Sequence, residues 1–154
     1  MAIISNDQEL RTLLNNLPDD QQRIVGARFA ESVIHLSKDE RVNRAISTGL
    51  RPDVGSDELE DAYRGAKSWA TKTYTDCGKD TDWLAQADHF VAAATAAALA
   101  PAHLLPETTN RAWKAAMQAR MANNCELVEG ADGAHTDEVQ RQYAIASALI
   151  NAAG

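Results

Sequence analysis

The side chains best suited to chemistry in this 154-residue chain are a carboxylate and an imidazole four residues apart, Glu31 and His35. Residues at this spacing share one face of an α-helix, so the two groups could bond directly, with Arg28 on the same flank. A buried carboxylate beside a histidine could perform acid–base chemistry. Because the sequence supplies no nucleophile or oxyanion-binding group beside them, we interpret the three residues as a structural ion pair or a polar patch.

Two other groups of residues could bind a metal ion if the fold brought them together. Asp88, His89 and His103 flank a predicted helix and its exit at Pro101. The second group lies near a later helix start and consists of Asp132, His135, Asp137 and Glu138. A zinc site needs three or four converging donors, and the second group lacks the oxygen ladder of an EF-hand loop. We therefore expect no metal and no cofactor.

The sequence also lacks the motifs of common catalytic and nucleotide-binding sites. It contains no GxSxG, no GxxxxGK[ST] and no GxGxxG. Neither Cys77 nor Cys125 lies in the context of a nucleophile. We expect both thiols to be reduced, and a disulfide between them is the alternative. These absences favour a protein that is not an enzyme.

The clearest charge signal is a run of acids with no base among them. It places five carboxylates within nine residues, at Asp53, Asp57, Glu58, Glu60 and Asp61. A solvated helix start, stabilised by the helix dipole, explains such a run, and a docking surface for a basic protein is the alternative. At 100° per residue, Asp57, Glu60 and Asp61 share one flank of the helix. The acids predicted to extend this partner-binding surface are Glu126, Glu129 and Asp132.

The overall charge restricts the classes of partner. The chain carries 15 basic and 22 acidic residues, which gives a net charge of −7. Nucleic acids and anionic membranes require a basic surface, so neither is expected as a partner. The N-terminal residues lack the pattern of a signal peptide, and no apolar run reaches transmembrane length. We expect a cytoplasmic protein.

Hydrophobic periodicity divides the chain into seven helical segments and reveals no strand. The segments span about residues 7–16, 20–36, 37–49, 56–75, 81–100, 107–124 and 136–153. Gly130 and Gly133 indicate a loop over residues 125–135. The expected fold is all-α, a single compact bundle of six or seven helices that uses residues 1–154 as one domain.

The segment DHFVAAATAAAL, residues 88–99, is rich in alanine and ends before Pro101. Alanine is the best helix former, and its small side chain lets neighbouring helices approach closely. This pattern predicts a helix in the centre of the bundle. Ala94, together with Ala97 or Ala98, should be almost fully buried.

Three stretches of the chain carry a resemblance to a known family. They are ARFAESVIHL at 27–36, DERVNRAI at 39–46 and AAATAAALAPAH at 92–103. In this order and spacing they resemble the all-helical Imm-5-like immunity proteins of bacterial polymorphic toxin systems, over residues 24–103. The chain departs from that family at Pro101, where the family has an unbroken Ala-x-Ala-His tract. The resemblance implies a toxin domain as partner, inhibited by occlusion of its active site.

These observations favour a non-enzymatic binding protein whose acidic surface neutralises a basic toxin. A nuclease is the first expectation for that toxin, because a nuclease must be basic to bind nucleic acid. The alternative is a helical small-molecule-binding or regulatory domain with a site between helices, which a pocket at Trp69, Trp83 and Trp113 would favour. A third class, an enzyme, would require Glu31 and His35 to be buried and convergent.

Overall fold

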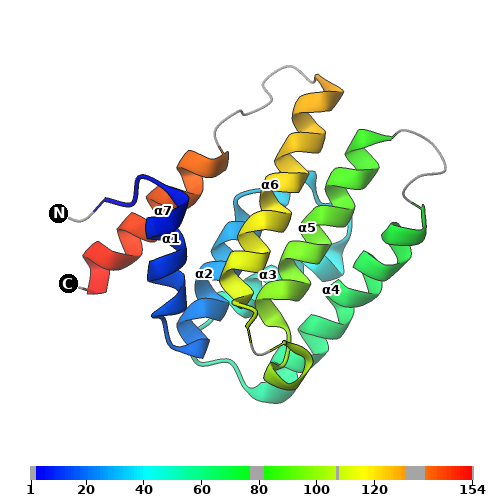
Figure 1. Ribbon diagram of the computed structural model, residues 1–154. Coiled ribbons are helices and arrows are strands. Elements are labelled where there is room, and N and C mark those ends of the chain that lie inside the picture. Colours follow the sequence, from blue (N-terminus) through cyan, green and yellow to red (C-terminus); the bar gives the residue numbers. More distant parts are fainter. Residues whose placement is uncertain (1–2, 77–81, 107, 131–137, 154) are drawn as a thin grey trace.

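Helices form every regular element in the computed structural model, which describes residues 3–76, 82–106, 108–130 and 138–153 (Figure 1). The elements are α1 (Asp7–Asn15), α2 (Asp19–Glu31), η1 (Ile34–Leu36), α3 (Glu40–Gly49), α4 (Ser56–Asp76), α5 (Trp83–Leu99), η2 (Ala102–Leu104), α6 (Arg111–Glu129) and α7 (Glu138–Ala153). No strand occurs in these ranges, and the predicted all-α bundle is confirmed. A membrane span would need a longer and more apolar helix than any in the described part of the chain.

Four helices begin directly after a side chain that accepts a hydrogen bond from their first turn. Such a side chain satisfies a backbone N–H that has no partner within the helix. The capping residues of α1, α3, α5 and α6 are Asn6, Asp39, Asp82 and Asn110. Local sequence therefore sets the starting points of the two helices that pair in the centre of the bundle, α5 and α6.

The second helix is shorter than predicted, since the sequence suggested residues 20–36 and α2 ends at Glu31. The Ser32 hydroxyl lies 2.6 Å from the Phe29 carbonyl oxygen, and Val33 leaves the helical conformation with φ −118° and ψ 17°. β-Branched residues such as Val33 and Ile34 disfavour the helix. The chain then forms the short η1, so His35 no longer continues the face that carries Glu31.

The sixth helix differs from its prediction at both ends. It begins at Arg111 after the Asn110 cap, and it continues through Cys125 to Glu129, where a loop was expected. The extension buries Cys125 and Glu126 against the bundle. Gly130 ends the helix in the left-handed region, with φ 72°, a conformation that glycine adopts without steric cost.

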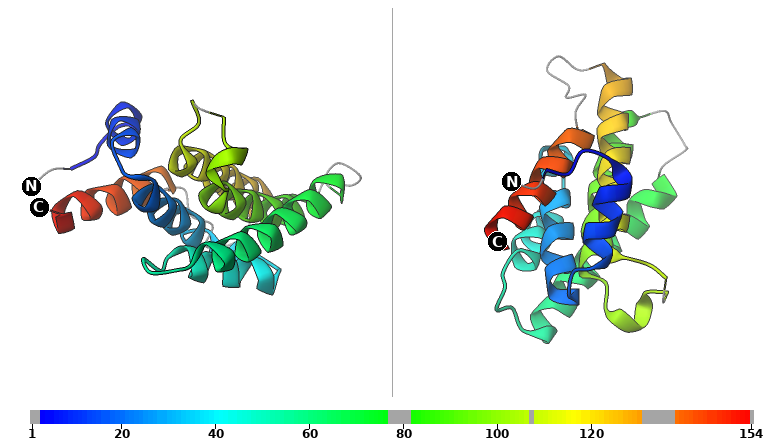
Figure 2. Two further views of the ribbon diagram at one scale, coloured as in Figure 1. Left: turned by 90° about the horizontal axis from the view of Figure 1, so that it is seen from below. Right: turned by 60° about the vertical axis from the view of Figure 1, so that its left-hand side comes forward.

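The alanine-rich helix α5 lies in the centre of the bundle, as predicted. It packs against α4 and α6 on its two sides and against α2 and α3 behind (Figures 1 and 2). Ala94 and Ala98 have no exposed surface. A Cβ atom added at Gly26 of α2 would lie 2.9 Å from the Cβ of Ala98. Small side chains on both helices thus allow the close approach.

Two buried arginines hold the carboxyl ends of helices. Arg111 donates hydrogen bonds to the carbonyl oxygens of Ala98 and Ala100 at the end of α5. Arg23 likewise donates to the carbonyl oxygens of Gly49, the last residue of α3, and of Arg51, at 3.1 and 2.6 Å. The last carbonyls of a helix lack partners within it, and these guanidinium groups supply them. The end of α5 and the turn after it are fixed in this way.

A network of polar side chains attaches α1 and α7 to the rest of the bundle. The Asp7 carboxylate accepts hydrogen bonds from Arg120, at 2.8 and 3.0 Å, and from the Tyr143 hydroxyl at 2.8 Å. Arg120 also donates to the fully buried Gln142, whose amide donates to the Ala116 carbonyl. The network joins α1, α6 and α7, which are far apart in sequence.

Candidate functional site

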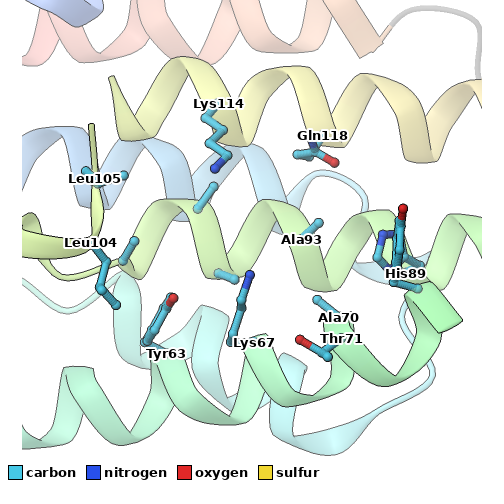
Figure 3. Close-up of a pocket in the computed structure, with 14 residues that line it drawn as sticks. Tyr63, Lys67, Ala70, Thr71, His89, Ala93, Leu104, Leu105, Lys114 and Gln118 are labelled. Atoms are coloured by element: carbon cyan, nitrogen blue, oxygen red, sulfur yellow. The ribbon is translucent and has the colours of Figure 1, made fainter. Parts of the chain in front are cut away.

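A groove of about 420 Å³ runs along α5, between α4 and α6, and one end is closed by η2 (Figure 3). Its floor consists of Ala93, Ala96, Ala97 and Ala100. This spacing places Ala93, Ala96 and Ala97 on one face of the helix, and Ala100 follows directly after its end. The floor is low because alanine has no side chain beyond Cβ, while the neighbouring helices carry longer side chains that form the walls.

Polar side chains project from both walls. Tyr63, Lys67 and Thr71 follow one another at four-residue spacing on α4, and Lys114 and Gln118 do so on α6. Figure 3 shows the side chains of Lys67 and Lys114 extending toward each other from opposite walls, above the alanine floor. The groove therefore concentrates two positive charges contributed by helices that are distant in sequence.

The charge of the groove is opposite to that of the whole chain. None of the described residues that line it is acidic, although the chain has 22 acidic residues. Both lysines are exposed, and neither forms an ion pair in the part of the chain that the structure describes. Their ammonium groups are accordingly available to a negatively charged ligand.

His89 marks the end of the groove that lies away from η2. Its Nδ1 atom lies 2.9 Å from the Thr73 hydroxyl, and its ring lies against Tyr74. Burial lowers the pKa of His89 below its ordinary 6.5; Lys67 lowers it further, and the Ala70 carbonyl and Asp88 act in the opposite direction. The neutral ring is favoured at pH 7, and protonation would add a third positive charge to the groove.

Asp88, His89 and His103, the first of the two groups that could have bound a metal ion, do not converge. Asp88 is buried and accepts hydrogen bonds from the Lys38 backbone N–H at 2.8 Å and the Trp69 indole N–H at 2.9 Å. His89 faces the groove, and His103 is exposed on η2. No set of three or more possible ligands converges within the described ranges. Asp132, His135 and Asp137 of the second group lie outside them, and Glu138 bonds Ser32 and Arg141.

The predicted Glu31–His35 pair is not formed, because α2 ends between the two residues. Glu31 is exposed and lies 3.7 Å from Arg28. His35 instead places its Nε2 atom 3.0 Å from the Glu126 carboxylate, across the bundle on α6. The hypothesis of an acid–base site at Glu31 and His35 is therefore wrong, because the two side chains do not converge.

The acidic cluster on α4 is exposed but partly neutralised. Glu58 pairs with Arg51 at 2.5 Å, and Glu60 pairs with Arg64 at 2.7 Å. Asp57 and Asp61 are exposed, and the described residues provide no ion-pair partner for either. Asp53, in the loop before α4, lies 4.0 Å from Arg51. Two of the five carboxylates in the predicted cluster therefore have no ion-pair partner among the described residues.

The predicted C-terminal acids do not form one surface. Glu126 is 8 % exposed and bonds His35, so its expected place on an exposed docking surface is wrong. Its burial follows from the extension of α6 beyond residue 124. Glu129 is exposed near the end of that helix, and Asp132 lies outside the described residues.

The three tryptophans do not enclose the interior pocket that would have favoured a small-molecule site there. Trp69 and Trp83 pack against one hydrophobic cluster and Trp113 against another. Trp69 also donates a hydrogen bond to Asp88, and the guanidinium groups of Arg11 and Arg120 lie 4.8 and 5.8 Å from the centre of the Trp113 ring. The groove lies elsewhere, on α5, where the sequence had indicated packing alone.

The groove residues were not predicted as a site from the sequence. A signal was present, since Tyr63, Lys67 and Thr71 on one helix and Lys114 and Gln118 on another have four-residue spacing. Which faces of α4 and α6 meet over α5 depends on tertiary packing, and periodicity does not specify it. Cys77 lies outside the described residues and Cys125 is buried, so the predicted redox state of the pair stays a prediction.

Comparison of this chain with protein-family models, with curated proteins and with solved structures gives no significant match. The resemblance to immunity proteins therefore stays a prediction, and an assignment of function depends on the chain's own geometry and charge.

Proposed function

We propose that this protein is a non-enzymatic binding protein that holds a small anionic molecule in the groove between α4, α5 and α6. The observation that carries the proposal is the pair of lysines, Lys67 and Lys114, which extend toward each other from opposite walls (Figure 3). An anion above the alanine floor could contact both ammonium groups at once.

The electrostatics of the whole chain support a local role for these lysines. A net charge of −7 repels anions at long range, so the protein surface as a whole would not attract them. The groove is an exception because its described lining contains two lysines and no carboxylate. Binding is favoured over catalysis, since the lining offers no carboxylate base and His89 is engaged with Thr73.

Isothermal titration calorimetry with acetate, inorganic phosphate and octanoate tests the proposal. At least one of these anions should bind to the wild-type protein, and Lys67→Gln or Lys114→Gln should weaken that binding about fivefold. Lys38→Gln is the matched control, because it removes the same charge from an exposed lysine outside the groove. Equal weakening in the control, or no binding of any of the three anions, would contradict the proposal.

A second candidate function is the docking of a basic protein, such as a toxin domain, on the exposed flank of α4. The observation in its favour is that Asp57 and Asp61, one helical turn apart, are exposed without an ion-pair partner among the described residues. The resemblance to immunity proteins points to the same class of partner. Clustered charge of one sign accelerates association with an oppositely charged surface.

Reversal of charge on this flank tests the second candidate. Glu60→Lys with Asp61→Lys should reduce the association rate with a basic toxin domain and flatten its salt dependence, while circular dichroism stays unchanged. The control is Glu40→Lys on α3, an exposed acid outside the cluster. An unchanged association rate in the double variant would remove this surface as the docking site.

A further inference from the structure

The two ends of the groove differ in chemical character. At one end, η2 and the residue after it contribute Leu104 and Leu105 (Figure 3). At the other end, the walls carry Thr71 and Gln118, and His89 projects from α5. Lys67 and Lys114 lie between the ends. A ligand that fills the groove on the η2 side meets two cations and then an apolar surface.

Leu104 is one of the few large apolar side chains that the described surface exposes, at 54 %. It stands beside the half-buried Leu105 and the buried Ala100 at the end of the alanine floor. An exposed leucine alone requires no explanation. This one continues the alanine floor, which leads past Tyr63 to the two lysines, so a ligand with an apolar part would cover it.

The leucine end is held in place before any ligand arrives. Arg111 donates to the carbonyl oxygens of Ala98 and Ala100, and the Leu104 and Leu105 backbone N–H groups donate to Pro101 and Ala102 at 3.0 and 3.2 Å. A preformed surface reduces the entropy lost when a ligand binds. The floor from Ala93 to Ala100 measures about 10 Å along the helix, and the lysines lie within that length, so the tail that reaches Leu104 from the head group is short.

We propose that the ligand of this groove is an anionic amphiphile, with one anionic head group between Lys67 and Lys114 and an apolar tail against Leu104 and Leu105. This inference rests on the proposed function, the binding of an anion in the same groove. A carboxylate or a phosphate could serve as the head group, because two ammonium groups bind either. The apolar tail is what separates this ligand class from inorganic anions.

A calorimetric series that varies tail and head group separately tests the inference. Octanoate should bind the wild-type protein at least about tenfold more tightly than acetate, because its additional methylene groups leave water. Octanol, with the same tail and no charge, should bind more weakly than octanoate. Octyl phosphate should also bind more tightly than inorganic phosphate, and its affinity relative to octanoate identifies the preferred head group.

Substitutions of the protein residues that would contact the two ends of the ligand provide a second test. Leu104→Asn should weaken octanoate about threefold or more and leave acetate unchanged, whereas Lys67→Gln should weaken both anions. Val128→Asn on α6 is the control, because this valine is also exposed, at 58 %, and does not line the groove. Circular dichroism verifies that each variant is folded.

The possible outcomes distinguish failure of the amphiphile proposal from failure of the proposed anion-binding function. Equal affinity for acetate and octanoate, or an unchanged octanoate affinity in Leu104→Asn, would contradict the proposal that the ligand is an amphiphile. Either result would still be consistent with an anion-binding site. Binding of octanol as tight as that of octanoate would overturn the role of the head group. Failure of every anion to bind would contradict the proposed function itself.

Discussion

At the scale of the residue, Gly26 shows how little space separates α2 from α5. A Cβ atom at this position would lie 2.9 Å from the Ala98 Cβ atom and 3.3 Å from its Cα atom. Both atoms belong to a buried helix and cannot rotate away. Gly26→Ala should therefore destabilise the protein by about 1–3 kcal/mol through overpacking, as measured by urea unfolding.

Gly65 provides the matched control on α4. The nearest atom to a Cβ at this position is the Arg41 Cβ, at an ordinary contact distance of 3.6 Å. Gly65→Ala should leave stability unchanged or raise it by about 0.5–1 kcal/mol, because alanine favours the helix. Equal stability of the two variants would show that α2 and α5 are less closely packed than described.

Ionisation of Asp7 makes the stability of the folded protein depend on pH in the acidic range. The hydrogen bonds from Arg120 hold the pKa of its carboxyl below the ordinary 3.8, with Tyr143 acting in the same direction and burial opposing. Because the folded-state pKa is lowered, the stabilisation is fully present above pH 3.8 and is lost as pH falls through the folded value. Asp7→Asn should lower the melting temperature at pH 7 and differ less from wild type near pH 2. A constant difference at both pH values would contradict this linkage.

At the scale of the element, the central position of α5 depends on small side chains. Ala94 is fully buried and lies outside the groove lining. Ala94→Leu should overpack the core and cost about 1–3 kcal/mol of unfolding free energy. Ala144→Leu, at an exposed position of α7, should change stability by less than about 0.5 kcal/mol. Chemical denaturation of both variants checks this, and a native-like Ala94→Leu would contradict the packing.

Elements were predictable where a local signal existed. The alanine-rich segment and the acidic start of α4 were located correctly, because propensity and charge at helix ends act within a few residues. The predicted end of α2 was wrong, since the Ser32 hydrogen bond and β-branched Val33 redirect the chain. The extension of α6 to Glu129 was missed because the burial of Cys125 and Glu126 is a tertiary effect.

The site was less predictable than the fold for the same reason. His35 and Glu126 lie 91 residues apart in sequence, and no pattern in the sequence connects them. Lys67 and Lys114 likewise line one groove only because α4 and α6 flank the same face of α5. Spacing identifies which residues share a helix face, whereas packing decides which faces meet.

At the scale of the whole molecule, a positive groove in a negative chain makes ligand affinity depend on pH. As pH falls through the lowered pKa of His89, the ring gains a charge among Lys67, Tyr74 and Asp88. Binding of octanesulfonate, which stays ionised, should therefore strengthen as pH falls below 6.5 and through the lowered pKa of His89, by about fivefold at most. Fluorescence competition or calorimetry at several pH values would measure the change.

Histidine variants isolate this effect. His89→Gln should abolish most of the pH dependence of octanesulfonate affinity, whereas His103→Gln, at an exposed position outside the groove, should preserve it. If His89→Gln retains the wild-type pH dependence of octanesulfonate affinity, another titrating group is responsible, and protonation of His89 does not affect binding in the groove.

The most direct test of the central claim is a two-dimensional ¹H–¹⁵N NMR titration with octanoate. We expect saturable shifts that concentrate on the amides of Lys67, Thr71, Lys114 and Gln118, and we expect these shifts to be lost in the double variant Lys67→Gln with Lys114→Gln. Shifts that never saturate, that map to another surface, or that persist in the double variant would contradict an anion-binding groove on α5.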